Sequence, residues 1–448
     1  MKAKHSELFK EIVNSYYNGN FEEKVTSILS SPEVNKEVLA AEIASLCGVE
    51  LDYSNNYIEN LKTAIRSYES SHQVVNKIKT CSMDCIDENG KTVCQKSCPF
   101  DAIFIDDERH TSSIDHDKCT GCGFCVEACQ TGALADRVEF LPLAELLRKK
   151  TPVIAAVAPA ITGQFGKDVS IYQLRTAFKK LGFTEMVEVA FFADMLTLKE
   201  AVEFDEHVKD KDDFLITSCC CPMWVAMVKR VYGDLVKHVS PSVSPMVAAG
   251  RVMKKLNPDC KVVFIGPCIA KKAEAKEKDL LGDIDYVLTF AELKDIFEAL
   301  DINPADCAED FSEEYASRGG RLYARTGGVS TAVSEAIEKL FPDKYKYLTT
   351  THANGVKECK EMLANAQNGI VKATFIEGMG CIGGCVGGPK AIIPRAEGTE
   401  RINEFAENSE IKVAVESDCM ISILKKLNIE SADDFKHKEK IEIFEREF

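Results

Sequence analysis

The sequence lacks any apolar run long enough to cross a membrane. Its longest apolar stretch, Val153 to Ile161, has the length of a strand. The charged first residues, Met1 to Glu7, are not followed by an apolar segment, so we expect no export signal and a cytoplasmic protein. Positive charge is also scarce: the sequence has 55 Lys and Arg residues but 71 Asp and Glu residues, which gives a formal net charge of −16. This deficit argues against a general nucleic-acid-binding surface.

Cysteine, by contrast, is abundant. The 448 residues are enough for two or three domains with a sizeable core, and 19 of them are cysteines. Without an export signal, so many cysteines favour metal ligation over disulfide bonds.

Eight of these cysteines follow the spacing of a two-cluster bacterial ferredoxin. A Cys-x2-Cys-x2-Cys-x3-Cys run follows a stretched copy of itself, and in this arrangement the fourth cysteine of each run binds the other cluster. We therefore predict one [4Fe–4S] cluster on Cys81, Cys85, Cys94 and Cys129, and another on Cys98, Cys119, Cys122 and Cys125. A zinc site is the alternative, and eight cysteines at this spacing disfavour it.

The rest of the chain divides into two further regions. Residues 1–75 hold no metal-ligand pattern and repeat apolar residues at helical spacing, so we expect a small helical region before a ferredoxin-like α+β domain at 76–138. In residues 139–448, apolar runs alternate with helical patterns, which predicts an α/β domain with parallel sheets. The expected strands are 153–158, 186–190, 214–218, 261–266, 284–290, 373–376 and 411–415.

Three cysteine groups follow expected strands of the α/β domain. They are the consecutive Cys219, Cys220 and Cys221, then Cys268, then Cys381 with Cys385. Parallel strands present their ligand sites at their carboxyl ends, so we expect one shared site there. Three adjacent thiols cannot all face one apolar pocket, which favours metal or thiol chemistry over core packing. By spacing alone, Lys271 and Glu274 fit a solvated helix face better than a site.

These segments resemble the three signature loops of the [FeFe]-hydrogenase catalytic domain. The matching stretches are Thr-Ser-Cys-Cys-Cys-Pro-Met-Trp (217–224), Pro-Cys-Ile-Ala-Lys-Lys-Ala-Glu (267–274) and Glu-Gly-Met-Gly-Cys-Ile-Gly-Gly-Cys (377–385). Residues 325–329 and 158–160 resemble further family segments, and the ferredoxin-like part precedes all of them, as in many members. The resemblance covers residues 76–448, and its details are similar to a divergent subgroup often called group B.

The resemblance implies an H-cluster, which is a [4Fe–4S] cubane joined through a cysteine sulfur to a two-iron unit. That unit carries CO, cyanide and a bridging amine dithiolate. The implied cubane ligands are Cys221, Cys268, Cys381 and Cys385, with Cys385 as the bridge. Other implied contacts of the cofactor are Lys271, Glu274, Met379, Pro159 and Ala160. An alignment on Thr-Ser would make Cys220 the ligand, whereas an alignment on Cys-Pro-x-Trp makes Cys221 the ligand. We prefer the second alignment because it continues without a gap to Ser240, which matches a serine of the family's proton path.

The implied reaction is the reversible formation of H2 from protons and electrons. Electrons would come from ferredoxin through the two clusters, and dedicated maturation proteins would assemble the cofactor. Cys220 would relay protons, followed by Glu200, Ser240 and Glu203; the alternative for the two glutamates is a role as exposed helix carboxylates. Three positions depart from the family pattern. Cys219 is an additional thiol, and Gly266 occupies a position near the cofactor that is commonly Met. His207 occupies a position where an Arg of the outer proton path is often found.

Two other functions are compatible with these motifs. One is a hydrogen-sensing or regulatory protein with little turnover, and the other is an iron–sulfur assembly factor of the related eukaryotic type.

Overall fold

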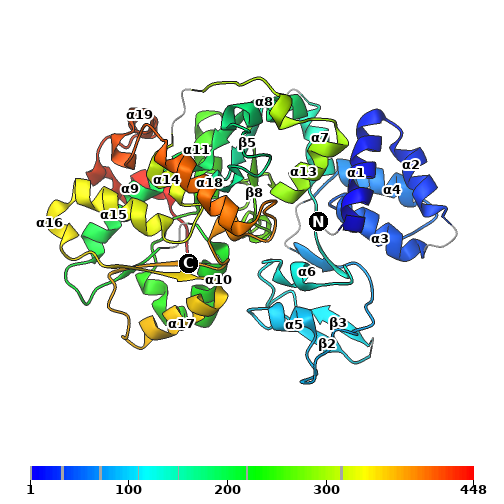
Figure 1. Ribbon diagram of the computed structural model, residues 1–448, viewed down its shortest axis with the longest axis horizontal. Helices are drawn as coiled ribbons and strands as arrows, with labels where there is room; N and C mark the ends of the chain where they lie inside the picture. Colours follow the sequence, from blue (N-terminus) through cyan, green and yellow to red (C-terminus); the bar gives the residue numbers. More distant parts are fainter. Residues whose placement is uncertain are drawn as a thin grey trace.

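The computed structural model describes residues 3–31, 35–69, 73–108, 110–149, 151–217, 220–312 and 316–448. Its N-terminal region is helical, as the sequence predicts, and forms a separate group beside the ferredoxin-like part (Figure 1). The helices are α1 (Ala3–Asn18), α2 (Phe21–Leu29), α3 (Lys36–Leu46) and α4 (Tyr57–Arg66). Asn35 precedes helix α3 as its N-cap, and its side chain accepts hydrogen bonds from the N–H groups of Glu37 and Val38. Helix α1 is fastened to the α/β region, where Ser6 Oγ donates to Asp295 at 2.7 Å.

The ferredoxin-like part consists of short elements around its cysteines. They are β1 (Val75–Lys77), α5 (Val93–Ser97), β2 (Ile103–Asp106), β3 (Thr111–Ile114), α6 (Phe124–Ala128) and β4 (Leu134–Asp136). Strand β1 pairs with β4 and β2 with β3, each antiparallel. A capping box between Thr92 and Gln95 begins α5. Gly123, with φ of 78°, precedes α6 in a left-handed conformation that favours glycine.

The α/β region contains the remaining elements. Its strands are β5 (Val153–Val157), β6 (Glu185–Glu188), β7 (Leu215–Ile216), β8 (Lys261–Gly266), β9 (Tyr286–Thr289), β10 (Thr350–Asn354) and β11 (Phe375–Met379). Its α-helices are α7 (Phe140–Leu147), α8 (Ile171–Leu181), α9 (Val189–His207), α10 (Pro222–Val231), α11 (Pro245–Leu256), α12 (Ala270–Glu274), α13 (Phe290–Ala299), α14 (Arg318–Leu322), α15 (Gly328–Leu340), α16 (Pro342–Tyr345), α17 (Val356–Gln367), α18 (Arg395–Glu407), α19 (Asp418–Lys426) and α20 (Lys438–Ile441).

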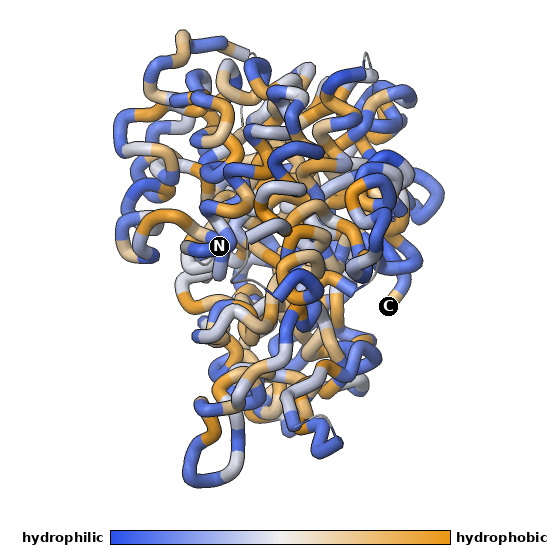
Figure 2. The backbone as a smooth tube through the Cα atoms, turned by 90° about the vertical axis from the view of Figure 1, so that its right-hand side faces the viewer, coloured by the Kyte–Doolittle hydropathy of each residue, from blue (hydrophilic) through white to orange (hydrophobic). Residues whose placement is uncertain are grey.

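Two parallel sheets organise this region. One has the strand order β6-β5-β8-β9 and the other has the order β10-β11-β7. Every residue of β5 is buried, as are all but the first of β8, which requires cover on both faces. Figure 1 shows helices around these strands, and Figure 2 shows apolar segments concentrated inside the molecule. The predicted α/β class with parallel sheets is therefore confirmed.

Two details of the strand prediction are wrong. Residues 411–415 do not form a strand. The carbonyls of Ile411 and Lys412 accept hydrogen bonds from the first N–H groups of α14, and a 3₁₀ turn (Ala414–Glu416) follows. Strand β10, at the edge of the second sheet, was not expected. Its sequence, Thr-Thr-His-Ala-Asn, has little of the apolar character used to find strands, and of its residues only Ala353 is buried.

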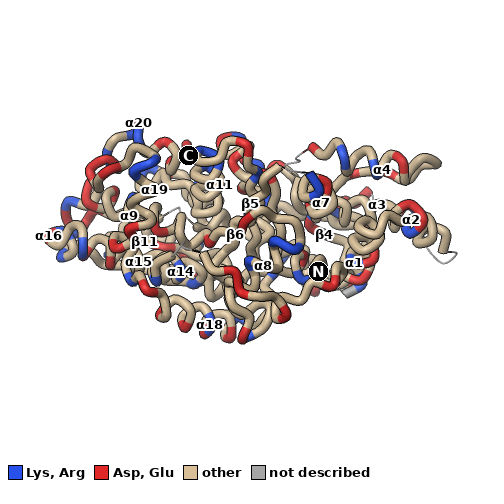
Figure 3. Tube along the Cα trace, turned by 90° about the horizontal axis from the view of Figure 1, so that it is seen from above, with Lys and Arg blue, Asp and Glu red and all other residues tan. Residues whose placement is uncertain are grey.

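Figure 3 shows acidic and basic residues interspersed along the chain. No helix in the described ranges is long and apolar enough to span a bilayer.

A buried ion network fastens the ferredoxin-like part to the α/β region. The Lys272 ammonium lies 2.9 Å from Asp136 and also donates to Glu292, and Lys390 lies 3.1 Å from Asp136. Burial raises the pKa of Asp136, but the two lysines outweigh it and hold this pKa below its usual range. The Asp136 charge therefore contributes to stability at neutral pH, and this contribution is lost as the pH falls through the lowered pKa of Asp136.

Replacing Lys272 by Met should lower the free energy of unfolding by about 3–5 kcal/mol, because Glu292 would lose its paired charge inside the protein. Urea unfolding followed by circular dichroism would measure the change. The matched control is Lys294→Met, which removes an exposed pair with Glu298 and should cost less than about 1 kcal/mol. Equal losses in both variants would contradict the assigned role of Lys272.

Candidate active site

Three loops converge at the carboxyl ends of β7, β8 and β11. These strands belong to two sheets, so the site lies where both sheets end. The loop after β11 touches the other two: the Gly380 N–H donates to Cys221 Sγ at 3.2 Å, and the Lys390 N–H donates to the Pro267 carbonyl at 3.0 Å. The structure therefore brings together the cysteine groups that lie far apart in the sequence.

Four cysteines lie within electrostatic reach of one another in this site. Burial, followed by the neighbouring cysteines, raises the pKa of Cys268 to about 11, that of Cys385 to about 12 and that of Cys381 well above its usual range. Cys221 contributes to all three shifts. Thiols with such raised pKa values lose their protons only when a metal cation binds them. Deprotonated cysteines are the ligands that an iron–sulfur cluster requires.

Cys220 has different surroundings from Cys221. Its thiol is buried and lies 3.7 Å from the Met379 sulfur, at the end of β11. Cys221 accepts from the Gly380 N–H and acts electrostatically on the three other site cysteines. Cys221 therefore stays the predicted ligand, and Cys220 lies beside Met379. The expected additional thiol, Cys219, lies outside the described residues.

Lys271 and Glu274 do not form a solvated helix face. Both side chains are buried, and the Lys271 ammonium donates to Glu274 at 2.7 Å. Burial lowers the pKa of Lys271, but Glu274, Cys268 and Cys385 outweigh it and raise this pKa. The site thus holds one fixed positive charge beside its thiols, suited to an anionic group.

Pro159 and Ala160 follow β5, the sheet neighbour of β8. Ala160 is buried, and its segment is tied to β8 by the Ala158 N–H, which donates to Ile265 O at 2.9 Å. The missing side chain at Gly266 has a steric reason here: a Cβ at this position would lie 2.5 Å from the Phe264 ring. A side chain at position 266 would therefore require the Phe264 ring to shift.

The two glutamates of α9 are buried rather than exposed. Glu200 accepts a hydrogen bond from Thr217 at 2.9 Å, and Glu203 accepts one from Ser240 at 2.6 Å. Helix α9 is buried on every side from Val189 to Phe204, so these carboxylates have no solvated face to occupy. The alternative of exposed helix carboxylates is wrong. Each carboxylate instead has a buried hydroxyl partner, Thr217 for Glu200 and Ser240 for Glu203.

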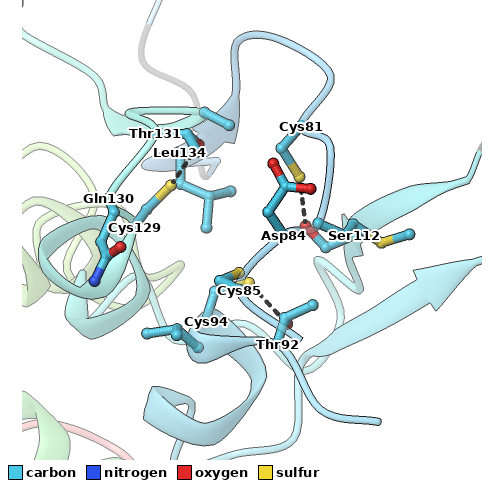
Figure 4. A pocket seen from close by; sticks show the side chains of 13 residues that line it. Cys81, Asp84, Cys85, Thr92, Cys94, Ser112, Cys129, Gln130, Thr131 and Leu134 are labelled. Atoms are coloured by element: carbon cyan, nitrogen blue, oxygen red, sulfur yellow. Dashed lines mark hydrogen bonds between the residues drawn. The ribbon is translucent and has the colours of Figure 1, made fainter. Parts of the chain in front are cut away.

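The ferredoxin-like part contains a cavity of about 140 Å³ among its predicted ligands. Figure 4 shows Cys81, Cys85, Cys94 and Cys129 around this cavity. Burial raises the pKa of Cys81, but hydrogen bonds from Thr111 and Ser112 outweigh it and lower the pKa to about 7. Hydrogen bonds of this kind stabilise thiolates and tune cluster potentials.

The other four ferredoxin-type cysteines line a second cavity. Cys98, Cys119, Cys122 and Cys125 surround it. It lies next to the α/β site, because a Cβ at Gly123 would fall 2.2 Å from Ile269, which follows Cys268. Cys122 also contributes to the raised pKa of Cys381. Among the described residues, no three His, Cys, Asp or Glu side chains are placed to hold a single metal ion; in a cubane, each cysteine binds a different iron and the sulfurs lie further apart.

Comparison with known proteins agrees with this geometry. Residues 151–389 match the model of the iron only hydrogenase large subunit, C-terminal domain, and residues 113–135 match a 4Fe-4S binding domain. The chain belongs to the iron-only hydrogenase family.

Individual relatives of this hydrogenase-family chain are distant. Iron hydrogenase 1 of Clostridium pasteurianum is 29% identical over 64% of this chain and 65% of its own length, so the chain spans slightly less than two thirds of it. The periplasmic [Fe] hydrogenase large subunit of Nitratidesulfovibrio vulgaris is 29% identical over 64% of this chain and 88% of its own. A probable cytosolic Fe-S cluster assembly factor of Drosophila ananassae is 24% identical over 53% and 61%.

A solved structure shares the fold. A variant of the [FeFe]-hydrogenase HydA1 from Chlamydomonas reinhardtii has a TM-score of 0.58 at 21% identity, over 68% of this chain and 97% of that chain. It supports the iron-hydrogenase architecture of the α/β region.

Three polar residues near the predicted site were not expected from the sequence. Lys199, Ser242 and Glu445 join the group around Glu203: Lys199 donates to Glu203 and, at 3.2 Å, to Ser242, and it lies 3.5 Å from Glu445. The sequence does contain one signal for Lys199, because this residue lies four residues before Glu203 in a mostly apolar helical stretch. Glu445 lies near the C-terminus and gives no local signal.

Replacing Cys94 by Ala should remove one cluster from the ferredoxin-like part, a loss of about four iron atoms per chain. The thiol is buried beside the 140 Å³ cavity, and no other described cysteine replaces it there. Iron analysis with electron paramagnetic resonance would measure the loss. Cys47→Ala is the control, because Cys47 is buried in the helical region and should leave the iron content unchanged. An unchanged iron content in Cys94→Ala would show that the ligand assignment is wrong.

Proposed function

We propose that this protein is a hydrogenase that interconverts protons and electrons with H2 at an H-cluster. The observation that carries the proposal is the convergence of Cys221, Cys268, Cys381 and Cys385 beside the buried Lys271. The four thiols would hold the cubane, with Cys385 as its bridge to the two-iron unit. When bound, the H-cluster would supply the redox-active metal site at which H2 forms or is split.

The chain's remaining residues would hold and shield this group. Lys271 would donate to a cyanide, since its ammonium is fixed by Glu274 and lies beside the thiols. Met379 would pack against the two-iron unit, with Pro159, Ala160 and Glu274 completing the surroundings. Most of these side chains are buried, so water would be largely excluded.

Electrons would enter through the ferredoxin-like part. The cavity of Cys81, Cys85, Cys94 and Cys129 would hold the outer [4Fe–4S] cluster, and the cavity of Cys98, Cys119, Cys122 and Cys125 the inner one. The contact of Gly123 with Ile269 supports this order, because it brings the second set next to Cys268. A ferredoxin in the cytoplasm is the electron carrier that we propose, and maturation proteins would deliver the two-iron unit.

Protons would be passed by Cys220 and the buried groups behind it. The Cys220 thiol lies beside Met379 and can donate and accept a proton. Glu200 is held by Thr217 just before the triple-cysteine loop, and Ser240 donates to Glu203 further along α9. The order that we propose is Cys220, Glu200, Ser240 and Glu203, and the hydrogen bond from Ser240 to Glu203 supports its last step.

An iron–sulfur assembly role is the second candidate, because proteins named as assembly factors are among the relatives. Infrared spectroscopy of protein matured under anaerobic conditions distinguishes the two functions. We expect CO and cyanide bands that shift under H2, together with H2 production. Bands without turnover would instead indicate a hydrogen-sensing protein. Iron–sulfur clusters without these bands, in protein treated with proven maturation factors, would indicate an assembly factor.

A further inference from the structure

Lys199 is completely buried in α9, one turn before Glu203. Its ammonium donates to Glu203 Oε1 and to Ser242 Oγ, the latter at 3.2 Å, and Glu445 Oε1 lies 3.5 Å away. An ammonium inside a protein is costly unless carboxylates accompany it. Lys199 therefore lies between two carboxylates, Glu203 inside the protein and Glu445 near its surface.

Glu203 uses its two carboxylate oxygens in different directions. Oε2 accepts from Ser240 at 2.6 Å, and Oε1 accepts from Lys199. His207 is the other candidate for an outer contact, but its Nδ1 lies 2.9 Å from the backbone carbonyl of Glu203 and not from the carboxylate. The carboxylate thus links the inner polar groups to Lys199 and not to His207.

The C-terminal segment holds Glu445 over Lys199. The segment runs along residues 241–243: the Val243 N–H donates to Phe444 O at 2.9 Å, and the Arg446 N–H donates to Pro241 O at 2.8 Å. Arg251 fixes the Glu445 carbonyl at 2.6 Å. The Glu445 side chain is 18% exposed and lines an open groove of about 1190 Å³.

We propose that Lys199 and Glu445 form the outer end of the proton path, between this groove and Glu203. A proton from water binds the Glu445 carboxylate, and the Lys199 ammonium gives a proton to the Glu203 carboxylate. Glu445 then restores the proton to Lys199. The net step moves one proton from water to Glu203, and the reverse order releases one. The part of the path from Glu203 to Cys220 rests on the proposed function. The part from the groove to Glu203 rests on the contacts of Lys199 and Glu445.

Hydrogen–deuterium exchange at the Cys220 thiol tests the proposal without requiring turnover. The S–H infrared band that disappears in Cys220→Ala identifies this thiol, and its loss after transfer to D2O gives the exchange rate. We expect exchange to slow about tenfold or more in Lys199→Met and in Glu445→Gln, since each removes a relay group. Glu447→Gln is the matched control, because Glu447 lines the same groove outside the chain of contacts.

The outcomes separate this proposal from the proposed function. Slower exchange in Glu445→Gln but not in Glu447→Gln supports the outer path, even in protein that shows no turnover. Parental exchange in Glu445→Gln, or slowing only in His207→Gln, overturns it. In protein that does turn over, we expect H2 production to fall about 10²-fold in Glu445→Gln and to keep the parental rate in Glu447→Gln.

Discussion

Replacing Cys385 by Ala should abolish H2 production and remove the CO and cyanide bands from the infrared spectrum of the matured protein. Cys385 is the proposed bridge between the cubane and the two-iron unit, so its loss removes both a cubane ligand and the attachment of that unit. Enzymatic rate enhancements are about 10⁶-fold or larger, and the assay would record such a loss as background. Infrared spectroscopy and an H2 assay on the same preparation measure both effects.

The control for this experiment is Cys260→Ala. Cys260 is also a buried cysteine of the α/β region, but it lies just before β8, at the amino end of a strand whose carboxyl end leads to the site. Its variant should keep the bands and the activity. Clusters in the ferredoxin-like part should survive in both variants, as electron paramagnetic resonance would show. Activity and bands retained in Cys385→Ala would refute the assignment of the bridge.

The cysteine groups could be predicted from the sequence because their signals are local. Cys-x2-Cys-x2-Cys-x3-Cys is a spacing within one loop, and each α/β cysteine group follows an apolar strand. Parallel strands bring their carboxyl ends to one edge, so separate loops such as those of Cys268 and Cys381 could be expected to meet. The structure adds that β8 and β11 belong to different sheets.

The polar surroundings of the site were harder to predict. Glu203 and Lys271 carry charges that usually lie in water, and sequence spacing does not distinguish a buried ion pair from an exposed one. Their burial depends on partners far along the chain: Ser240 reaches Glu203 from a separate segment, and Glu445 approaches Lys199 from the C-terminus. Such contacts follow from the tertiary packing and leave no periodic pattern in the sequence.

The two described members of the triple cysteine should respond differently to replacement by Ala. Cys221→Ala should lose the α/β cubane, with about four iron atoms per chain, because Cys221 accepts from the Gly380 N–H and raises the pKa of the other site cysteines. Cys220→Ala should keep its iron and its CO and cyanide bands. Its H2 production should fall by about 10²- to 10⁴-fold, the usual loss when a proton-transferring group is removed.

Iron analysis, infrared spectra and H2 assays of both variants would decide between the two registers of the first loop. If Cys220 were the ligand, the iron would be lost in Cys220→Ala and kept in Cys221→Ala. Cys359→Ala controls for the removal of a nearby thiol, since Cys359 donates to the Met379 carbonyl at 3.4 Å yet belongs to a separate hydrophobic cluster. It should keep both iron and turnover. The contrast between Cys220 and Cys221 would then depend on their positions relative to Met379 and Gly380, and not on the loss of a buried thiol as such.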